Sequence, residues 1–128
     1  MAATITRQTI IDNDGQLIVK IHIAGDAAGD LSAATLVDAS SYDPAFTSAS
    51  LERVEASLCG FAANLLWDAT TDVPLVSLPA DAATCFPDDI CVRIPNDAGT
   101  GKTGDINITT VGLAANDYGT ILLHLRKE

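Results

Sequence analysis

Hydrophobic and polar residues alternate along several short stretches of the chain, most clearly near its C-terminal end. In residues 105–111, Ile106 and Ile108 fall on one side, and Asp105, Asn107 and Thr109 fall on the other. In residues 120–126, isoleucine or leucine recurs at every second position. A period of two in β-branched and aliphatic residues is typical of half-buried strands. The pattern therefore predicts two strands here, joined by the loop of residues 112–119.

The same alternation predicts a β-hairpin at the start of the chain. Residues 4–11 and 16–23 form the two predicted strands, and in the second strand every odd-numbered residue is apolar. Residues 12–15, Asp-Asn-Asp-Gly, separate the strands. These residue types tolerate the positive φ angles of tight hairpin turns. We therefore predict an antiparallel pair of strands.

Three shorter strands are predicted at residues 33–39, 61–67 and 73–78. Pro74 and Pro79 place the last of these near a sheet edge, because proline cannot donate a hydrogen bond to a neighbouring strand. Residues 80–95 are predicted to be irregular. Residues 96–104 are rich in glycine and are predicted to form the most flexible loop.

Residues 49–59 fit two interpretations. The run LERVEASL consists largely of good helix formers, which favours a helix. We favour a strand, because Val54, Ala56 and Leu58 alternate with polar residues and Gly60 ends the run.

These stretches together predict an all-β fold. Strands recur about every ten residues, and no helical pattern of ten or more residues is present. We expect eight or nine strands in an antiparallel β-sandwich of jelly-roll or Greek-key type. The chain has 128 residues, which is enough for one domain spanning residues 1–128. A chain of this size buries roughly 65% of its unfolded surface and needs no metal or disulfide to fold.

The charge balance narrows the range of partners. The net charge is −10 at pH 7, and the seven Lys and Arg residues are scattered along the chain. Binding to nucleic acid or to an anionic membrane requires clustered basic residues, so we expect neither partner. We interpret the acidity mainly as a source of solubility. The alternative is an acidic face that meets a basic partner.

The three cysteines, Cys59, Cys85 and Cys91, are an odd number. The first ten residues lack the charged and apolar regions of a secretory signal, and the longest apolar runs are too short to span a membrane. We therefore expect synthesis in a cytoplasm and reduced thiols. A disulfide between Cys85 and Cys91 is the alternative.

No constellation of residues predicts catalysis or metal binding. Residues 99–103, Gly-Thr-Gly-Lys-Thr, resemble a phosphate-binding loop, but Asn96 stands where the first glycine is needed and a strand follows instead of a helix. Residues 26–30 lack the alternating carboxylates of a calcium loop. His22 and His124 lack the paired spacing of a zinc site. We therefore expect no enzymatic activity, cofactor or metal.

Two aromatic residues each fit two interpretations. Trp67, the only tryptophan, fits either a sugar-stacking platform or a core anchor, and we favour the anchor because aromatic residues are scarce. Tyr118 follows a short loop and precedes a strand. This position fits a tyrosine corner and an ordinary surface tyrosine equally well.

Four stretches of the chain resemble small virion structural proteins of tailed bacteriophages. They are Leu66–Thr71 (LWDATT), Ile94–Asn96 (IPN), Gly101–Ile106 (GKTGDI) and Ile121–Lys127 (ILLHLRK). The resemblance covers most of the second half, with a weaker likeness in the N-terminal hairpin. The similar proteins are of comparable length and look like capsid decoration or cement proteins.

The resemblance implies a β-rich, non-enzymatic protein that is made in the bacterial host cytoplasm and assembled onto the virion. Its partners would be the major capsid protein and other copies of itself, with a trimer as the candidate homo-oligomer. The resemblance implies no catalytic residue in this chain. The alternatives are a tail, collar or connector component of the same particle, or a glycan-binding β-sandwich module that uses Trp67.

Two segments are the candidate contact elements: an N-terminal arm of residues 1–8 and the loop of residues 97–104. The candidate interface residues are Ile5, Arg7, Gln8, Trp67, Asn96, Lys102 and Thr103. The alternative is that both segments are ordinary chain ends and loops without a contact role.

Overall fold

The computed structural model describes residues 4–27, 29–42, 44–81, 83–86 and 94–127, with the backbone alone described at residues 83–86. This part of the chain contains nine strands and one 3₁₀ turn. The strands are β1 (Thr4–Asp12), β2 (Gln16–Ala24), β3 (Ala34–Val37), β4 (Ala49–Cys59), β5 (Ala62–Trp67), β6 (Val73–Leu78), β7 (Ala83–Phe86), β8 (Ile106–Val111) and β9 (Tyr118–Lys127). The turn, η1 (Ala39–Ser41), follows β3.

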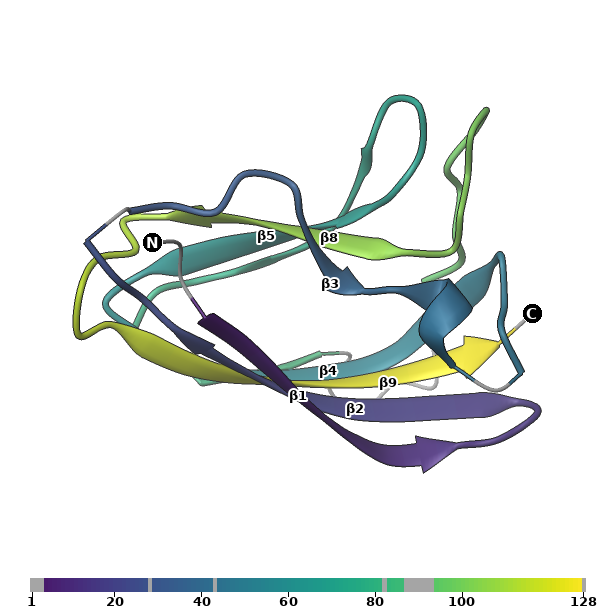
Figure 1. Ribbon diagram of the computed structural model, residues 1–128, viewed down its shortest axis with the longest axis horizontal. Helices are drawn as coiled ribbons and strands as arrows, with labels where there is room; N and C mark the ends of the chain where they lie inside the picture. The colour runs from purple at the N-terminus through teal and green to yellow at the C-terminus, as the bar shows by residue number, and fades with distance from the viewer. Residues whose placement is uncertain (1–3, 28, 43, 82, 87–93, 128) are drawn as a thin grey trace.

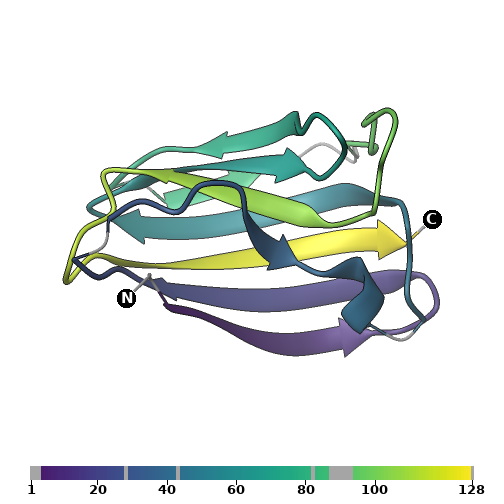
Figure 2. The ribbon, with the colours of Figure 1, turned by 45° about the horizontal axis from the view of Figure 1, so that its top comes forward.

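The strands form two stacked antiparallel sheets (Figure 1). The five-stranded sheet has the order β1-β2-β9-β4-β7, and the four-stranded sheet has the order β3-β8-β5-β6. Figure 2 shows β9, from the end of the chain, lying between β2 and β4. The predicted antiparallel β-sandwich is confirmed.

The N-terminal hairpin forms as predicted. β1 pairs antiparallel with β2 through most of its length, with one register shift between Thr9 and Ile11. The side chain of Asn13 holds the turn, because its Oδ1 accepts hydrogen bonds from the backbone N–H groups of Gly15 at 3.1 Å and Gln16 at 2.8 Å. Asparagine is common in such turns because its short side chain bonds to the nearby backbone.

The core lies between the two sheets and is built from the alternating apolar residues of the central strands. The odd-numbered residues of β2 are buried as predicted, and so are Val54, Ala56 and Leu58 of β4. This burial with a period of two confirms that residues 49–59 form a strand and not a helix. Burial of apolar side chains on both inner faces is the main driving force that holds the layers together.

One short strand lies where an irregular segment was predicted. β7, within residues 80–95, pairs with residues 54–57 of β4 at the edge of the five-stranded sheet. The prediction of irregular structure is therefore wrong at Ala83–Phe86. A four-residue strand is too short for its alternation to stand out, and it forms here because β4 offers a free edge. The predicted edge position of β6 is confirmed.

Several smaller expectations are tested as well. Cys59 is an exposed free thiol, whereas the question of a Cys85–Cys91 disulfide falls outside the side chains that the structure describes. Tyr118 is largely exposed, which corresponds to the surface tyrosine and not to a tyrosine corner. Among the described residues, no helix is both long enough and apolar enough to cross a membrane.

Candidate interaction surface

The two sheets have four edge strands, and β1 is the longest of them. β3 and β7 have four residues each, and β6 carries Pro74. Short strands and prolines are common means of preventing an exposed edge from pairing with another chain. β1 has nine residues, contains neither proline nor lysine, and is exposed along most of its length. It is therefore the most open edge in the described part of the molecule.

Three candidate interface residues lie on β1 and not in a free arm. Ile5 is half-buried and packs against the core, while Gln8 is exposed. Arg7 reaches across to the other sheet, where its Nε donates to Leu36 O at 2.8 Å and its Nη2 donates to Thr35 O at 2.6 Å. Arg7 thus links the two sheets on this side. Residues 1–3 of the predicted arm lie outside the described residues.

The end of β1 exposes two large apolar side chains. Ile10 is 51% exposed and Ile11 is 37% exposed, and Ile10 lies at the irregularity in the pairing with β2. A β-bulge of this kind inserts one unpaired residue and bends the strand locally. Single exposed apolar residues are ordinary, but two adjacent ones on an open edge favour a contact with another chain.

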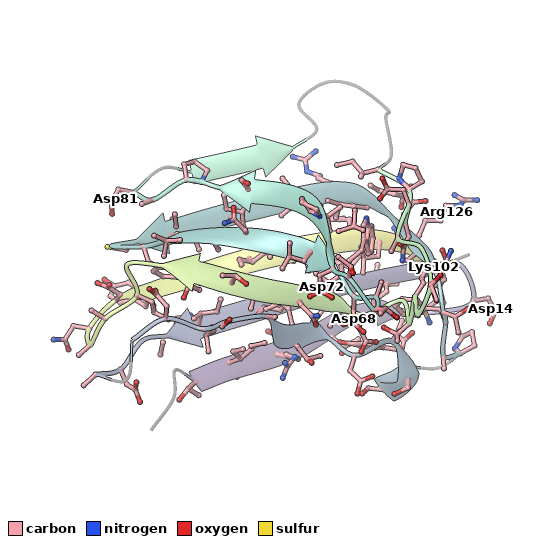
Figure 3. All side chains as sticks on the ribbon, turned by 90° about the horizontal axis from the view of Figure 1, so that it is seen from above. Asp14, Asp68, Asp72, Asp81, Lys102 and Arg126 are labelled. Atoms are coloured by element: carbon pink, nitrogen blue, oxygen red, sulfur yellow. The ribbon has the colours of Figure 1, made fainter. Side chains whose placement is uncertain are left out.

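A cluster of polar side chains joins two loops at one end of the sandwich. Asn107 of β8 donates through Nδ2 to Asp68 Oδ1 at 2.9 Å and to Asp72 Oδ2 at 3.1 Å. Thr103 Oγ1 donates to Asp68 Oδ2 at 2.7 Å. Figure 3 shows Asp68 and Asp72 close together at this end, with Lys102 nearby and Asp81 at the opposite end. The amide of Asn107 therefore holds two carboxylates together that would otherwise repel each other.

The same cluster explains why Asn107 is buried although its position in the alternation predicts a polar, outward side. Backbone hydrogen bonds beside this cluster also hold the loop of residues 96–104, which was predicted to be the most flexible. Thr70 N donates to Thr100 O at 3.0 Å, and Thr103 N donates to Asp68 O at 3.4 Å. Gly101 has a φ of +84° and lies so close to Thr70 that a Cβ atom would clash with it. These bonds link segments that are distant in the sequence, so composition alone could not reveal them.

The remaining candidate residues fall in different places. Lys102 is exposed at the tip of its loop, next to Thr103. Asn96 is half-buried and its Oδ1 accepts a hydrogen bond from Ala98 N at 3.0 Å. Trp67 is fully buried, so it is a core anchor and neither a surface contact nor a platform for sugars. The structure thus groups Lys102 with Thr103 and, separately, the β1 residues with one another.

Asp30 is held in place by two hydrogen bonds. Asp30 Oδ1 accepts from Leu113 N at 2.7 Å and from Thr110 Oγ1 at 3.1 Å. The bond from the Leu113 N–H is the main cause that lowers the pKa of Asp30. Among the described residues, no three His, Cys, Asp or Glu side chains gather as metal ligands would.

Charge is distributed unevenly between the two sheets. None of the residues in β3, β5, β6 and β8 is charged, so the outer face of the four-stranded sheet is uncharged except at the end where the Asp68 and Asp72 carboxylates bond to Asn107. Its exposed or half-exposed outward residues are Thr35, Ala62, Asn64, Leu66, Pro74, Ser77, Thr109 and Val111. We call this surface the neutral face.

The outer face of the five-stranded sheet is different. It exposes Lys20, Arg53 and Arg126, and Arg53 forms an ion pair with Glu55 at 2.7 Å. Of the aspartates that the structure describes, only Asp12 lies in a strand, so the acidic charge is concentrated in the loops at the two ends. The neutral face therefore presents uncharged side chains on a chain with a net charge of −10, and the carboxylates of Asp68 and Asp72 lie at one end of it.

Asp105, just before β8, gives a testable effect of pH on stability. Its Oδ1 accepts a hydrogen bond from Ala39 N at 2.8 Å. Burial raises the pKa of Asp105 against the lowering effect of this bond, and the negative charges of Asp38 and Asp68 raise it further. A carboxyl whose folded-state pKa is raised contributes stability at low pH, and this contribution is lost as the pH rises through that pKa.

We therefore expect Asp105→Asn to raise the melting temperature at pH 7 by a small amount, because the amide keeps an acceptor for Ala39 N and removes the charge. The gain should vanish below the ordinary carboxyl pKa of 3.8. Thermal unfolding followed by circular dichroism from pH 3 to pH 8 measures this. Asp105→Ala is the control, and it should lose about 1 kcal/mol because it removes the acceptor. A gain that is the same at every pH would contradict the assignment.

Comparison with models of known protein families gives no match, and comparison with curated protein sequences gives none either. By its fold, the chain is a two-layer antiparallel β-sandwich, and it has one neutral face and one long open edge strand, β1.

Proposed function

We propose that this protein is a non-enzymatic structural component of a bacteriophage virion, a decoration protein that binds the assembled shell and bridges neighbouring capsid subunits. Its partners in this proposal are the major capsid protein and further copies of itself, and its location is the virion. The sequence resemblance to phage structural proteins supports the proposal. The fold is also suited to the role, because a stiff sandwich can bridge two subunits without changing its conformation.

The neutral face is the observation that carries the proposal. Burying a charge in an interface costs free energy unless the charge is paired, and the cores of protein interfaces are depleted in charged residues. The neutral face combines small polar residues with exposed apolar ones such as Val111. Away from the end that carries Asp68 and Asp72, it can therefore meet a protein surface without desolvating a charge, although the chain as a whole is strongly acidic.

The charged parts of the molecule complement this arrangement. If the neutral face meets the shell, the five-stranded sheet and much of the acidic loop surface remain in water. Exposed charge of this kind keeps a coated particle soluble. Each contact of one copy with the shell can be weak, because many copies on a symmetric lattice act together when each copy spans two subunits.

The test is the addition of purified protein to empty shells of a candidate phage. We expect the protein to sediment with the shells and to raise their melting temperature. Asn64→Glu places a carboxylate in the middle of the neutral face, opposite Ser77 and Thr109. It should weaken shell binding by about tenfold or more, since about 1.4 kcal/mol corresponds to tenfold and desolvating one carboxylate costs at least that much.

Thr120→Glu is the matched control. It adds the same carboxylate at an exposed position of the five-stranded sheet, between Ser57 and His22. It should leave shell binding unchanged. Shells that do not respond to the wild-type protein, or variants that weaken binding equally, would contradict the proposal.

A tail, collar or connector component remains the alternative within the same particle. Quantitative mass spectrometry of purified particles separates the two. A decoration protein should be present in numbers comparable to the capsid protein, whereas a connector component forms a single ring. The glycan-binding alternative loses its proposed platform, because Trp67 is fully buried.

A further inference from the structure

The open edge of β1 presents backbone groups without partners in the described part of the chain. Among the described strands, β1 pairs only with β2, and the backbone–backbone hydrogen bonds described for residues 4–11 lie within that pairing. In an edge strand, the N–H and C=O groups of alternate residues point away from the sheet. These groups can form hydrogen bonds with another strand as readily as with water.

The features that usually prevent an edge strand from pairing with another chain, such as charged side chains and bulges, are few on β1. Its one charged residue before Asp12 is Arg7, and the Arg7 guanidinium is engaged with Leu36 O and Thr35 O of the other sheet. The charge is therefore directed toward the gap between the sheets and not along the free edge. The irregularity at Ile10 is the remaining barrier, and it leaves residues 4–9 in regular register with β2.

We propose that two copies of this chain associate edge to edge through β1, so that their five-stranded sheets join into one continuous antiparallel sheet. A two-fold axis perpendicular to the sheet relates the two strands, and the contact is the same patch on both copies. This proposal concerns self-association alone and does not depend on the proposed role on a shell.

A second copy is the partner that fits this edge for two reasons. First, β1 is already extended in every copy, so no segment has to become ordered on binding, and this lowers the cost of association. Second, two copies with a net charge of −10 repel each other least where acidic residues are few. β1 has one acidic residue, Asp12, and that carboxylate is paired with Lys127.

The symmetry limits the register of the pairing. Residues directly opposite each other in an antiparallel pair point to the same face, whereas neighbouring residues of one strand point to opposite faces. A two-fold axis between two neighbouring residues would place them opposite each other, which is not possible. The axis must therefore pass through a position at which one residue of β1 lies opposite the same residue of the second copy. With the axis at Thr6, Ile5 lies opposite Arg7 of the second copy and Thr4 lies opposite its Gln8. This register uses the regular part of β1 and avoids placing the two Arg7 residues opposite each other.

The first test is the oligomeric state of the purified full chain, measured by sedimentation velocity over a wide concentration range. We expect a monomer–dimer equilibrium. Replacing Thr6 and Gln8 together with lysine should weaken dimerisation by at least about tenfold, because exposed edge lysines disfavour strand pairing and like charges would meet at the axis. The control replaces Thr120 and Ser57 with lysine, which adds the same charge on the same sheet away from its edge. The control should dimerise like the wild type.

The second test is covalent. Thr6→Cys should form a symmetric intermolecular disulfide under mild oxidation, because opposite Cβ atoms in a strand pair lie about 4.5–5.5 Å apart. It is made in a Cys59→Ser background, with Thr120→Cys in the same background as the control. A wild-type monomer at all concentrations, a trimer that the edge lysines do not affect, or equal cross-linking of both cysteine variants would overturn the proposal.

Discussion

Replacing Trp67 with alanine is expected to lower the free energy of unfolding by about 3–5 kcal/mol. Trp67 is 0% exposed and is the largest fully buried side chain in the described residues. In the four-stranded sheet it lies opposite Ile106 on one side and Val73 on the other. Alanine would therefore leave a large cavity that the surrounding strands can fill only in part. Such a loss is a large fraction of the ~5–15 kcal/mol that stabilises a typical domain.

The measurement is denaturant unfolding followed by far-ultraviolet circular dichroism, because the variant lacks the fluorescent probe. Trp67→Phe is the matched control. Trp67 Nε1 is buried without a hydrogen-bond partner among the described residues. Phenylalanine keeps most of the apolar area and removes this unpaired donor, so we expect it to cost less than half as much as alanine. A loss below about 1 kcal/mol for alanine would contradict the core position.

Replacing Lys127 with alanine is expected to lower the free energy of unfolding by about 2–4 kcal/mol. The Lys127 side chain is 3% exposed, and its Nζ donates to Asp12 Oδ1 at 2.5 Å and to Pro44 O at 2.9 Å. The ammonium also lies 5.8 Å from the centre of the Phe46 ring. Breaking a buried ion pair leaves the partner less well solvated than in water. The expected loss is moderated because the Asp12 side chain is still 21% exposed.

Lys127→Met separates the charge from the packing of the side-chain stem. It retains the apolar stem and should recover part of the loss seen with alanine. Combining Lys127→Met with Asp12→Asn in a double-mutant cycle isolates the interaction between the two charges. We expect a coupling of about 1 kcal/mol or more, since a pair shielded from solvent is only weakly screened by salt. A coupling near zero would mean that Lys127 stabilises the fold through Pro44 O, Phe46 and packing and not through Asp12.

The strand positions could be predicted to within a few residues because alternation is a local property. A strand places successive side chains on opposite faces, so Leu17, Val19 and Ile21 had to share one face once residues 16–23 were extended. The same argument located Val54 and Leu58 correctly. It failed at β7 because four residues are too few to show a period, and their pairing partner is distant in the sequence.

The structural surroundings of the candidate interface residues could be predicted less well, for a related reason. Residues 1–8 were singled out as a contact arm. The described part of that segment, residues 4–8, belongs to an edge strand, and its openness follows from the order of strands in the sheet. Arg7 was named, but its bonds to Leu36 and Thr35 join residues that are far apart in the chain. Trp67 had two interpretations in the sequence, and the packing of the two sheets decided between them.

The sequence by itself determined the β class, the hairpin at the start of the chain and the apolar faces that form the core. These features follow from the short-range geometry of the backbone and from turn residues such as Asn13 and Gly15. Only the tertiary structure decided that four uncharged strands would gather in one sheet, that β1 would be an edge, and that Lys127 would meet Asp12. Those outcomes depend on which strands pair across long separations, and that choice is made by packing between segments rather than by any one of them.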